Sequence, residues 1–153
     1  MEVWAFRAWH KNEKKMYEVS GFEIVLEGQG KAKVTLAERD PENKYHTHWT
    51  WMSEVIIMRA TPILDSKGLL IFEQDIILLD NAYWAISFGD WKIPIKNSNI
   101  IIPNAATQTN ICGVGYYLLN SQKGALIHME DVARRGTVVG NAFENEYLLK
   151  LAT

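Results

Sequence analysis

The chain has 153 residues, of which 48% are apolar and 22% are charged. This balance predicts a globular protein with a substantial core, and it excludes a disordered tail or a fibre. The 16 basic and 18 acidic residues give a net charge of −2, which disfavours strong nonspecific binding of nucleic acid. A single cysteine excludes an intramolecular disulfide and fits a reducing cytosol. Because no apolar run approaches the roughly 18 residues of a spanning helix, we expect a soluble, cytoplasmic protein.

Short β-strands are expected along the first third of the chain. Residues 3–9 and 15–19 are rich in β-branched and aromatic types and flank a polar turn, which predicts a β-hairpin. Residues 22–27 form another apolar run, set off by glycines on both sides. Residues 31–38 alternate between apolar and polar types, as in a strand with one solvated face. Residues 45–60 are expected to hold one or two more strands.

After Thr61, short apolar runs are separated by turn residues. Asp65 and Gly68 occupy the first and last positions of a predicted turn, where aspartate caps amides and glycine takes an unusual dihedral. Gly89-Asp90 is expected to separate two strands. Pro94 predicts an edge strand, because proline has no amide to donate to a neighbouring strand. Strands this short and numerous predict a small barrel or a sandwich.

Two helices are expected near the C-terminus. Asn145 is placed to cap a helix whose apolar residues face the body of the protein. Residues 128–135 have acidic residues before basic ones and are followed by Gly136, which favours a second short helix. The only domain boundary that the pattern suggests lies near residues 59–61.

No set of residues has the spacing of an active site. His46 and His48 share a face of a predicted strand, but two ligands are fewer than a metal needs, so we interpret them as part of a solvated strand face. Glu73 and Asp75 are interpreted as turn carboxylates that accept backbone amides. Cys112 has no base close to it in the sequence. We therefore expect no enzymatic activity, no metal and no cofactor.

The six tryptophans are the unusual part of the composition. Most of them lie in predicted strands, where a large ring usually belongs to the core. Trp49 and Trp51 project from the same face of one strand, and exposed rings in such an arrangement stack on bases or contact an extended peptide. Arg7 lies beside Trp9 in the first hairpin. The candidate partner-binding residues are therefore Arg7, Trp9, Trp49 and Trp51.

Three short motifs follow one another along the chain. The first is Phe6-Arg7-Ala8-Trp9 with residues 15–19 after the polar turn, the second runs from Thr61 to Ile77, and the third is Val138 to Asn145. In this order they resemble the N-terminal, central and closing motifs of the YopX family of phage and prophage proteins. The family has glycine where this chain has Gln74. A left-handed turn there would place the glutamine in a backbone conformation that costs about 1 kcal/mol.

The resemblance implies a fold and no activity. It implies a mainly β (α+β) protein, with a small N-terminal α+β region at residues 1–59 and an SH3-like β-barrel domain at residues 60–153 that ends in a short helix. In this fold Asp75 and Asn141 are expected to accept backbone amides at two bends. The family brings no established activity, cofactor or catalytic residues.

Two functions from different classes remain open. The first is a noncatalytic accessory protein, encoded by a phage or prophage and located in the bacterial cytoplasm, which binds another protein or self-associates through an exposed groove or strand edge. The alternative is single-stranded nucleic-acid binding through aromatic side chains. An enzyme is the third choice.

Overall fold

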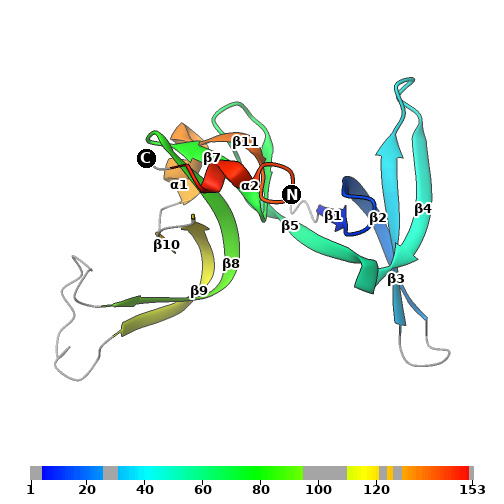
Figure 1. Cartoon of the computed structure of the whole chain (residues 1–153), viewed down its shortest axis with the longest axis horizontal. Helices are drawn as coiled ribbons and strands as arrows, with labels where there is room; N and C mark the ends of the chain where they lie inside the picture. The colour runs from blue at the N-terminus through cyan, green and yellow to red at the C-terminus, as the bar shows by residue number, and fades with distance from the viewer. Residues whose placement is uncertain (1–4, 26–30, 95–109, 121–123, 126–128, 152–153) are drawn as a thin grey trace.

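The computed structural model describes residues 5–25, 31–94, 110–120, 124–125 and 129–151, and these residues are mainly in β-strands (Figure 1). The first sheet is antiparallel, with the strand order β4-β3-β2-β1-β5-β6. A short 3-10 helix, η1 (Met52–Glu54), connects β4 to β5. The strands of this sheet are β1 (Phe6–His10), β2 (Lys15–Val25), β3 (Lys31–Arg39), β4 (Tyr45–Trp51), β5 (Val55–Leu64) and β6 (Leu70–Phe72).

The second sheet is also antiparallel, with the strand order β10-β9-β8-β7-β11. Two short helices accompany it, α1 (Met129–Arg135) and α2 (Glu146–Leu149), in the two places where the sequence predicts helices. The strands are β7 (Asp75–Leu79), β8 (Ala82–Pro94), β9 (Asn110–Leu119), β10 (Gly124–Ala125) and β11 (Thr137–Asn141).

The predicted first hairpin is confirmed, because β1 and β2 pair in antiparallel register. The interruption expected at Gly21 is instead a bulge. β2 continues to Val25, and its register against β3 shifts between Val19 and Gly21, which bends the strand without ending it. The alternation in β3 is confirmed as well, since Val34 and Leu36 are fully buried.

The turn before β6 follows the predicted chemistry. One oxygen of Asp65 accepts the amides of Lys67 and Leu69, both at 2.9 Å, and Gly68 has a φ of 84°, which only glycine adopts without cost. The other carboxylate oxygen accepts the amide of Val138 at 2.9 Å. Asp65 therefore closes its own turn and also attaches that turn to β11.

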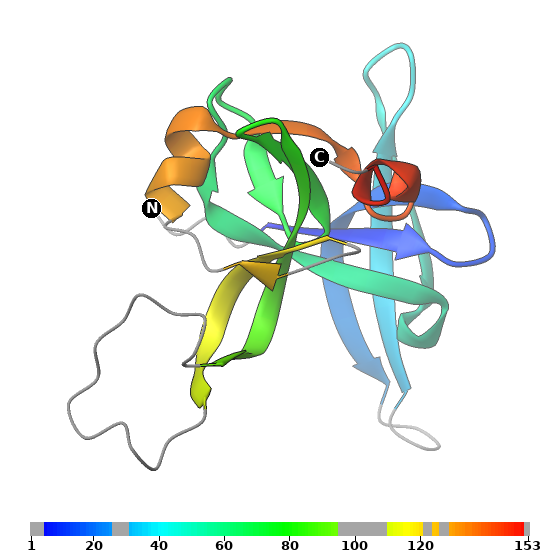
Figure 2. The same ribbon diagram turned by 60° about the vertical axis from the view of Figure 1, so that its left-hand side comes forward.

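The break expected at Gly89-Asp90 is wrong, because β8 runs through both residues as one strand of 13 residues. Gly89 lies opposite Gly115 of β9, and the pairing of β8 with β9 continues through this position, where neither strand has a side chain. Only the start of β8, as far as Ala85, also pairs with β7. The rest forms a two-stranded ribbon with β9 that extends away from the body of the molecule, and Pro94 lies at its end (Figure 1, Figure 2).

The described residues form two apolar cores. The core of the first sheet is small and is formed by Ala8, Tyr17, Val34, Leu36 and Val55. The second core lies between the second sheet, β6 and α1. Its buried members are Ile71, Ile77, Leu79, Ala82, Trp84, Ile86, Leu118 and Val132. Trp84 thus has the core position predicted for most of the tryptophans.

One strand connects the two halves. β5 pairs with β1 along its first part and with β6 along its last part, and Figure 1 shows it passing from the lobe that holds β1 to β4 to the lobe that holds β7 and β11. The boundary expected between residues 59 and 60 falls inside β5. The division into two domains stays a prediction.

Two details of the expected fold are not confirmed. The described strands form two open antiparallel sheets rather than a closed barrel. The described part of residues 1–59 contains strands and η1 but no α-helix, so the α+β character expected there is not confirmed. The mainly β class is confirmed.

Candidate binding surface

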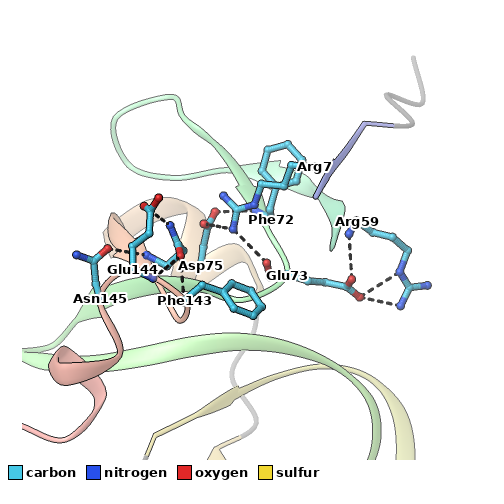
Figure 3. A network of polar contacts seen from close by, with 9 residues as sticks. Arg7, Arg59, Phe72, Glu73, Asp75, Phe143, Glu144 and Asn145 are labelled. Carbon is cyan, nitrogen blue, oxygen red and sulfur yellow. Dashed lines mark hydrogen bonds and ion pairs between the residues drawn. The ribbon is translucent and has the colours of Figure 1, made fainter. Parts of the chain in front are cut away.

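A buried ion pair joins the first and second sequence motifs. One guanidinium nitrogen of Arg7 lies 2.6 Å from a carboxylate oxygen of Asp75, whose side chain is 3% exposed (Figure 3). The same nitrogen donates to the backbone carbonyl of Glu73 at 3.2 Å, and the guanidinium carbon lies 4.8 Å from the centre of the Phe72 ring. Asp75 also accepts the amide of Phe72 at 2.8 Å, which confirms its predicted role at the bend.

A second ion pair lies beside the first. The guanidinium of Arg59 donates to one carboxylate oxygen of Glu73 at 2.7 and 3.0 Å, and the backbone amide of Arg59 donates to the other oxygen at 2.9 Å (Figure 3). Glu73 thus accepts one backbone amide, as predicted for a turn carboxylate, but its other oxygen is held by a guanidinium that the prediction did not include.

The third motif completes this junction. The side-chain oxygen of Asn141 accepts the amides of Phe143 and Glu144, both at 3.0 Å, which confirms the bend predicted there (Figure 3). The Phe143 ring stacks on Trp9 with 5.4 Å between ring centres and an interplanar angle of 17°. We use the name motif junction for Arg7, Trp9, Asp75, Asn141 and Phe143. It fastens the first sheet to the end of β11.

The polar groups of the motif junction have the properties of structural groups. Burial raises the pKa of Asp75, although the Arg7 guanidinium and the Phe72 amide favour its charged form. Because the carboxylate is held by that ion pair and that amide, it has a structural explanation that needs no substrate.

Strand β4 carries the exposed aromatic surface. Trp49 is 53% exposed and makes an edge-on contact with Trp51, with 5.3 Å between ring centres. The ammonium group of Lys33 lies 4.3 Å from the centre of the Trp49 ring and 5.6 Å from that of Trp51. The ammonium of Lys31 also lies 5.6 Å from the centre of Trp51. We call these four residues the Trp–Lys surface.

The sheet register explains this cluster. Lys33 of β3 is paired directly with Trp51 of β4, and Thr35 with Trp49, so side chains from both strands project from one face. Further along the same face, the guanidinium carbon of Arg39 lies 4.0 Å from the centre of the Tyr45 ring. The face therefore combines aromatic rings with cations along the whole length of β4.

The two lysines of this surface have no acidic partner among the described residues. By contrast, Lys15 pairs with Glu38, and Lys44 pairs with Glu42 at 2.7 Å. The ammonium groups of Lys31 and Lys33 contact ring faces instead, an interaction worth about 0.5–1 kcal/mol at an exposed site. Their charge remains available to a ligand.

β4 is also an edge strand. In the described part of the chain it pairs with β3 alone, and residues 45–49 are exposed. Edge strands of monomeric proteins usually carry lysine, proline or bulges that prevent pairing with another strand. Tyr45–Trp51 has none of these protections and consists of aromatic residues, threonines and histidines that favour β-structure. A pocket of about 240 Å³ lies at its end, lined by Lys31, Ala32, Trp51, Met52 and Ser53.

The opposite face of β4 carries the two histidines, which share a face as predicted. His46 lies 2.8 Å from a carboxylate oxygen of Asp40, and His48 contacts the edge of Tyr17 with 5.2 Å between ring centres. Tyr17 donates to the Glu13 carboxylate, and its burial together with this bond raises its pKa to about 12. Among the described residues no group of three or more His, Cys, Asp or Glu is arranged to hold a metal ion.

The four predicted binding residues fall in two places. Trp49 and Trp51 come together on β4. Arg7 and Trp9 lie on β1, three strands further into the sheet, and Trp9 is only 7% exposed because it packs in the motif junction. Lys31 and Lys33 were not among the predicted binding residues. Their position at the rings depends on the register between β3 and β4, which the spacing within either strand does not reveal. The side chain of Cys112 lies outside the described residues.

The fold and this surface define a mainly β protein with two antiparallel sheets and with an aromatic edge strand at one end of the first sheet. The chain belongs to the YopX family, whose model, described as YopX protein, matches residues 5–150.

The solved structures that are similar to the chain include the following two. Protein EF1440 from Enterococcus faecalis matches with a TM-score of 0.54 and 17% identity, over 97% of this chain and 99% of that one. Protein yopX from Bacillus subtilis matches with a TM-score of 0.40 and 13% identity, over 97% and 98%. A comparison with curated proteins finds no match. No helix in the described ranges has the length and apolar character needed to cross a bilayer.

Proposed function

We propose that the chain is a noncatalytic protein-binding module that binds an extended protein segment along the open edge of β4. The observation that carries this proposal is the unprotected edge of a seven-residue strand beside the exposed Trp49–Trp51 pair. Backbone groups of such an edge hydrogen-bond to an added strand, and side chains on one face select which segment binds.

The geometry of the edge supports this mode. An added strand lies about 4.8 Å from β4, with its side chains alternating between the two faces. Its residues on the tryptophan face would contact Trp49 and Trp51 as cross-strand neighbours. Two large rings offer apolar contact area at low entropic cost, since each has only two rotatable bonds.

The biological setting is part of the same proposal. Membership of the YopX family supports an accessory protein that is encoded by a phage or prophage and acts in the bacterial cytoplasm. The motif residues have structural explanations, which supports a role without catalysis. The SH3-like barrel and the N-terminal α+β region remain family-based expectations.

Selection of a random linear peptide library on the purified full-length chain tests the proposal. We expect bound peptides to slow hydrogen exchange of β4 amides, and Trp49→Ala to weaken binding by about tenfold, since a buried aromatic contact contributes 1–2 kcal/mol. Tyr147→Ala on α2 is the matched control, because it removes an aromatic ring that is 61% exposed and should leave binding unchanged. Protection confined to other strands would contradict the proposal.

A second candidate function is single-stranded nucleic-acid binding. The observation that favours it is the pair of lysines without acidic partners next to two tryptophan rings. Three facts weigh against it: the net charge of −2, the position of Arg7 and Trp9 in the motif junction, and the Lys33 ammonium over the ring faces that bases would need. Fluorescence anisotropy with a labelled oligothymidylate at low salt tests it, and no binding there would remove its support.

A further inference from the structure

We infer that the protein segment bound by β4 is acidic, with carboxylate side chains at alternate positions that pair with Lys31 and Lys33. This inference rests on the proposed function, because it specifies the chemistry of the segment that the edge binds. Three observations support it: the positions of the two ammonium groups, the distribution of the other charged residues on the same face, and the spacing of the two lysines along β3.

The ammonium groups of Lys31 and Lys33 contact rings of β4, although the lysines belong to β3. The Lys33 ammonium is 4.3 Å from the centre of the Trp49 ring, which belongs to the edge strand itself. An added strand is only about 4.8 Å beyond β4. A glutamate or aspartate on that strand, directed to the same face, therefore reaches the ammonium of Lys33 across the tryptophan ring.

On this face the basic residues lie nearer to the edge of the sheet, and the acidic residues lie further toward its interior. Lys31, Lys33 and Arg39 are the charged residues that β3 and β4 contribute to it. The acidic residues on this face, Glu18 and Glu23, are on β2, one strand further from the edge. Glu23 is paired directly with Lys33 but forms no ion pair with it, and Glu18 accepts the hydroxyl of Tyr45 at 2.7 Å. A segment at the edge therefore meets cations first.

The spacing specifies where the acids stand. Lys31 and Lys33 are two residues apart on one strand, and both ammonium groups lie 5.6 Å from the centre of the Trp51 ring. Successive side chains on one face of an added strand are also two residues apart. Acidic residues at positions i and i+2 would match the two lysines.

The same charges disfavour a second copy as the occupant. Antiparallel pairing of β4 with β4 would place two strands side by side that have no carboxylate, next to the lysines and arginine of both copies. Nucleic acid supplies negative charge, but its backbone has no alternating amide and carbonyl groups to pair with the strand edge. An acidic extended peptide satisfies both the charge and the hydrogen-bonding requirement.

The experiment repeats the random peptide selection with the wild-type full-length chain and with the double variant Lys31→Gln/Lys33→Gln. We expect wild-type selection to enrich Asp and Glu at alternate positions, and the double variant to bind the best acidic peptide about tenfold more weakly, as two exposed ion pairs allow. Lys44→Gln is the matched control, since Lys44 lies in the turn between the two strands and already pairs with Glu42. Affinity for the acidic peptide should also fall with added salt.

The possible outcomes distinguish a failure of the acidic-segment inference from a failure of the proposed peptide-binding function. Tight binding of neutral peptides by the wild type and the double variant alike would overturn the acidic segment and leave the peptide-binding function standing. Failure to select any peptide would overturn both. Preferential binding of oligothymidylate at the Trp–Lys surface would replace both with the nucleic-acid function. A dimer that Trp49→Ala dissociates would show that the occupant is a second copy, which also overturns the inference.

Discussion

The Arg7 guanidinium and the Asp75 carboxylate form an ion pair of 2.6 Å between the first strand of one sheet and the first strand of the other. Both side chains are largely buried, Phe72 lies against the Arg7 guanidinium, and Asn141 is the register partner of Asp75 on β11 (Figure 3). Two motifs that are far apart in the sequence therefore depend on each other directly.

The losses of stability from removing the two partners of this ion pair should not be additive. Arg7→Met leaves the Asp75 charge buried without its cation, which we expect to cost about 3 kcal/mol of unfolding free energy. In Arg7→Met/Asp75→Asn that charge is gone, so the double variant should lose clearly less than the sum of the two single variants. Urea unfolding of the four proteins measures this coupling, and additive losses would show that the two side chains act independently.

Gln74→Gly should stabilise the protein. Gln74 has a φ of 66°, the left-handed conformation predicted from the family glycine at this position. Relief of that strain contributes about 1 kcal/mol, reduced somewhat by the greater freedom of glycine in the unfolded chain. Gln74→Ala keeps a Cβ and the same strain, so it is the control that should gain nothing. Equal stability of the glycine and alanine variants in thermal unfolding would refute this explanation.

Gly140→Ala should destabilise the closing motif. A Cβ at this position would lie 2.3 Å from the side-chain oxygen of Asn145, which accepts the amide of Asn141 at 3.2 Å. Relieving that overlap requires movement of Asn145, and we expect a loss of about 1–3 kcal/mol. Gly21→Ala is the control, because nothing lies within 4 Å of a Cβ there. Similar losses for both variants would mean that contact with Asn145 is not the cause.

The contribution of Asp65 should depend on pH. Burial acts to raise its pKa, but the amides of Val138, Leu69 and Lys67 outweigh burial and hold the pKa below its ordinary value of 3.8. The folded state therefore favours the carboxylate. Its contribution to stability is complete above the unfolded pKa and is lost as the pH falls through the folded pKa.

Asp65→Asn tests this dependence. The difference in unfolding free energy between wild type and Asp65→Asn should be largest near pH 7 and should shrink below about pH 4. Urea unfolding at both pH values measures it. A difference that stays constant or grows on acidification would have the wrong sign for a carboxylate with a lowered pKa.

Local chemistry was predictable from the sequence, and long-range register was not. Asp65 and Gly68 define their turn through neighbouring residues, and the positive φ of Gln74 follows from the glycine that the family has there. The continuation of β8 through Gly89 depends on Gly115 of another strand, so no local pattern revealed it. The candidate surface shows the same division: Trp49 and Trp51 were identified from their spacing, whereas Lys33 required the pairing of β3 with β4.

β5 fixes the orientation of the edge strand β4 relative to the other half of the molecule. A partner on β4 would be held by a sheet whose hydrogen bonds continue through β3, β2 and β1 into β5, and β5 enters the other half of the molecule without a flexible linker. The Arg7–Asp75 pair braces the same connection. A protein segment bound along β4, as proposed, would therefore be held at a set angle to the other half of the molecule, unlike a segment bound to a domain on a flexible tether.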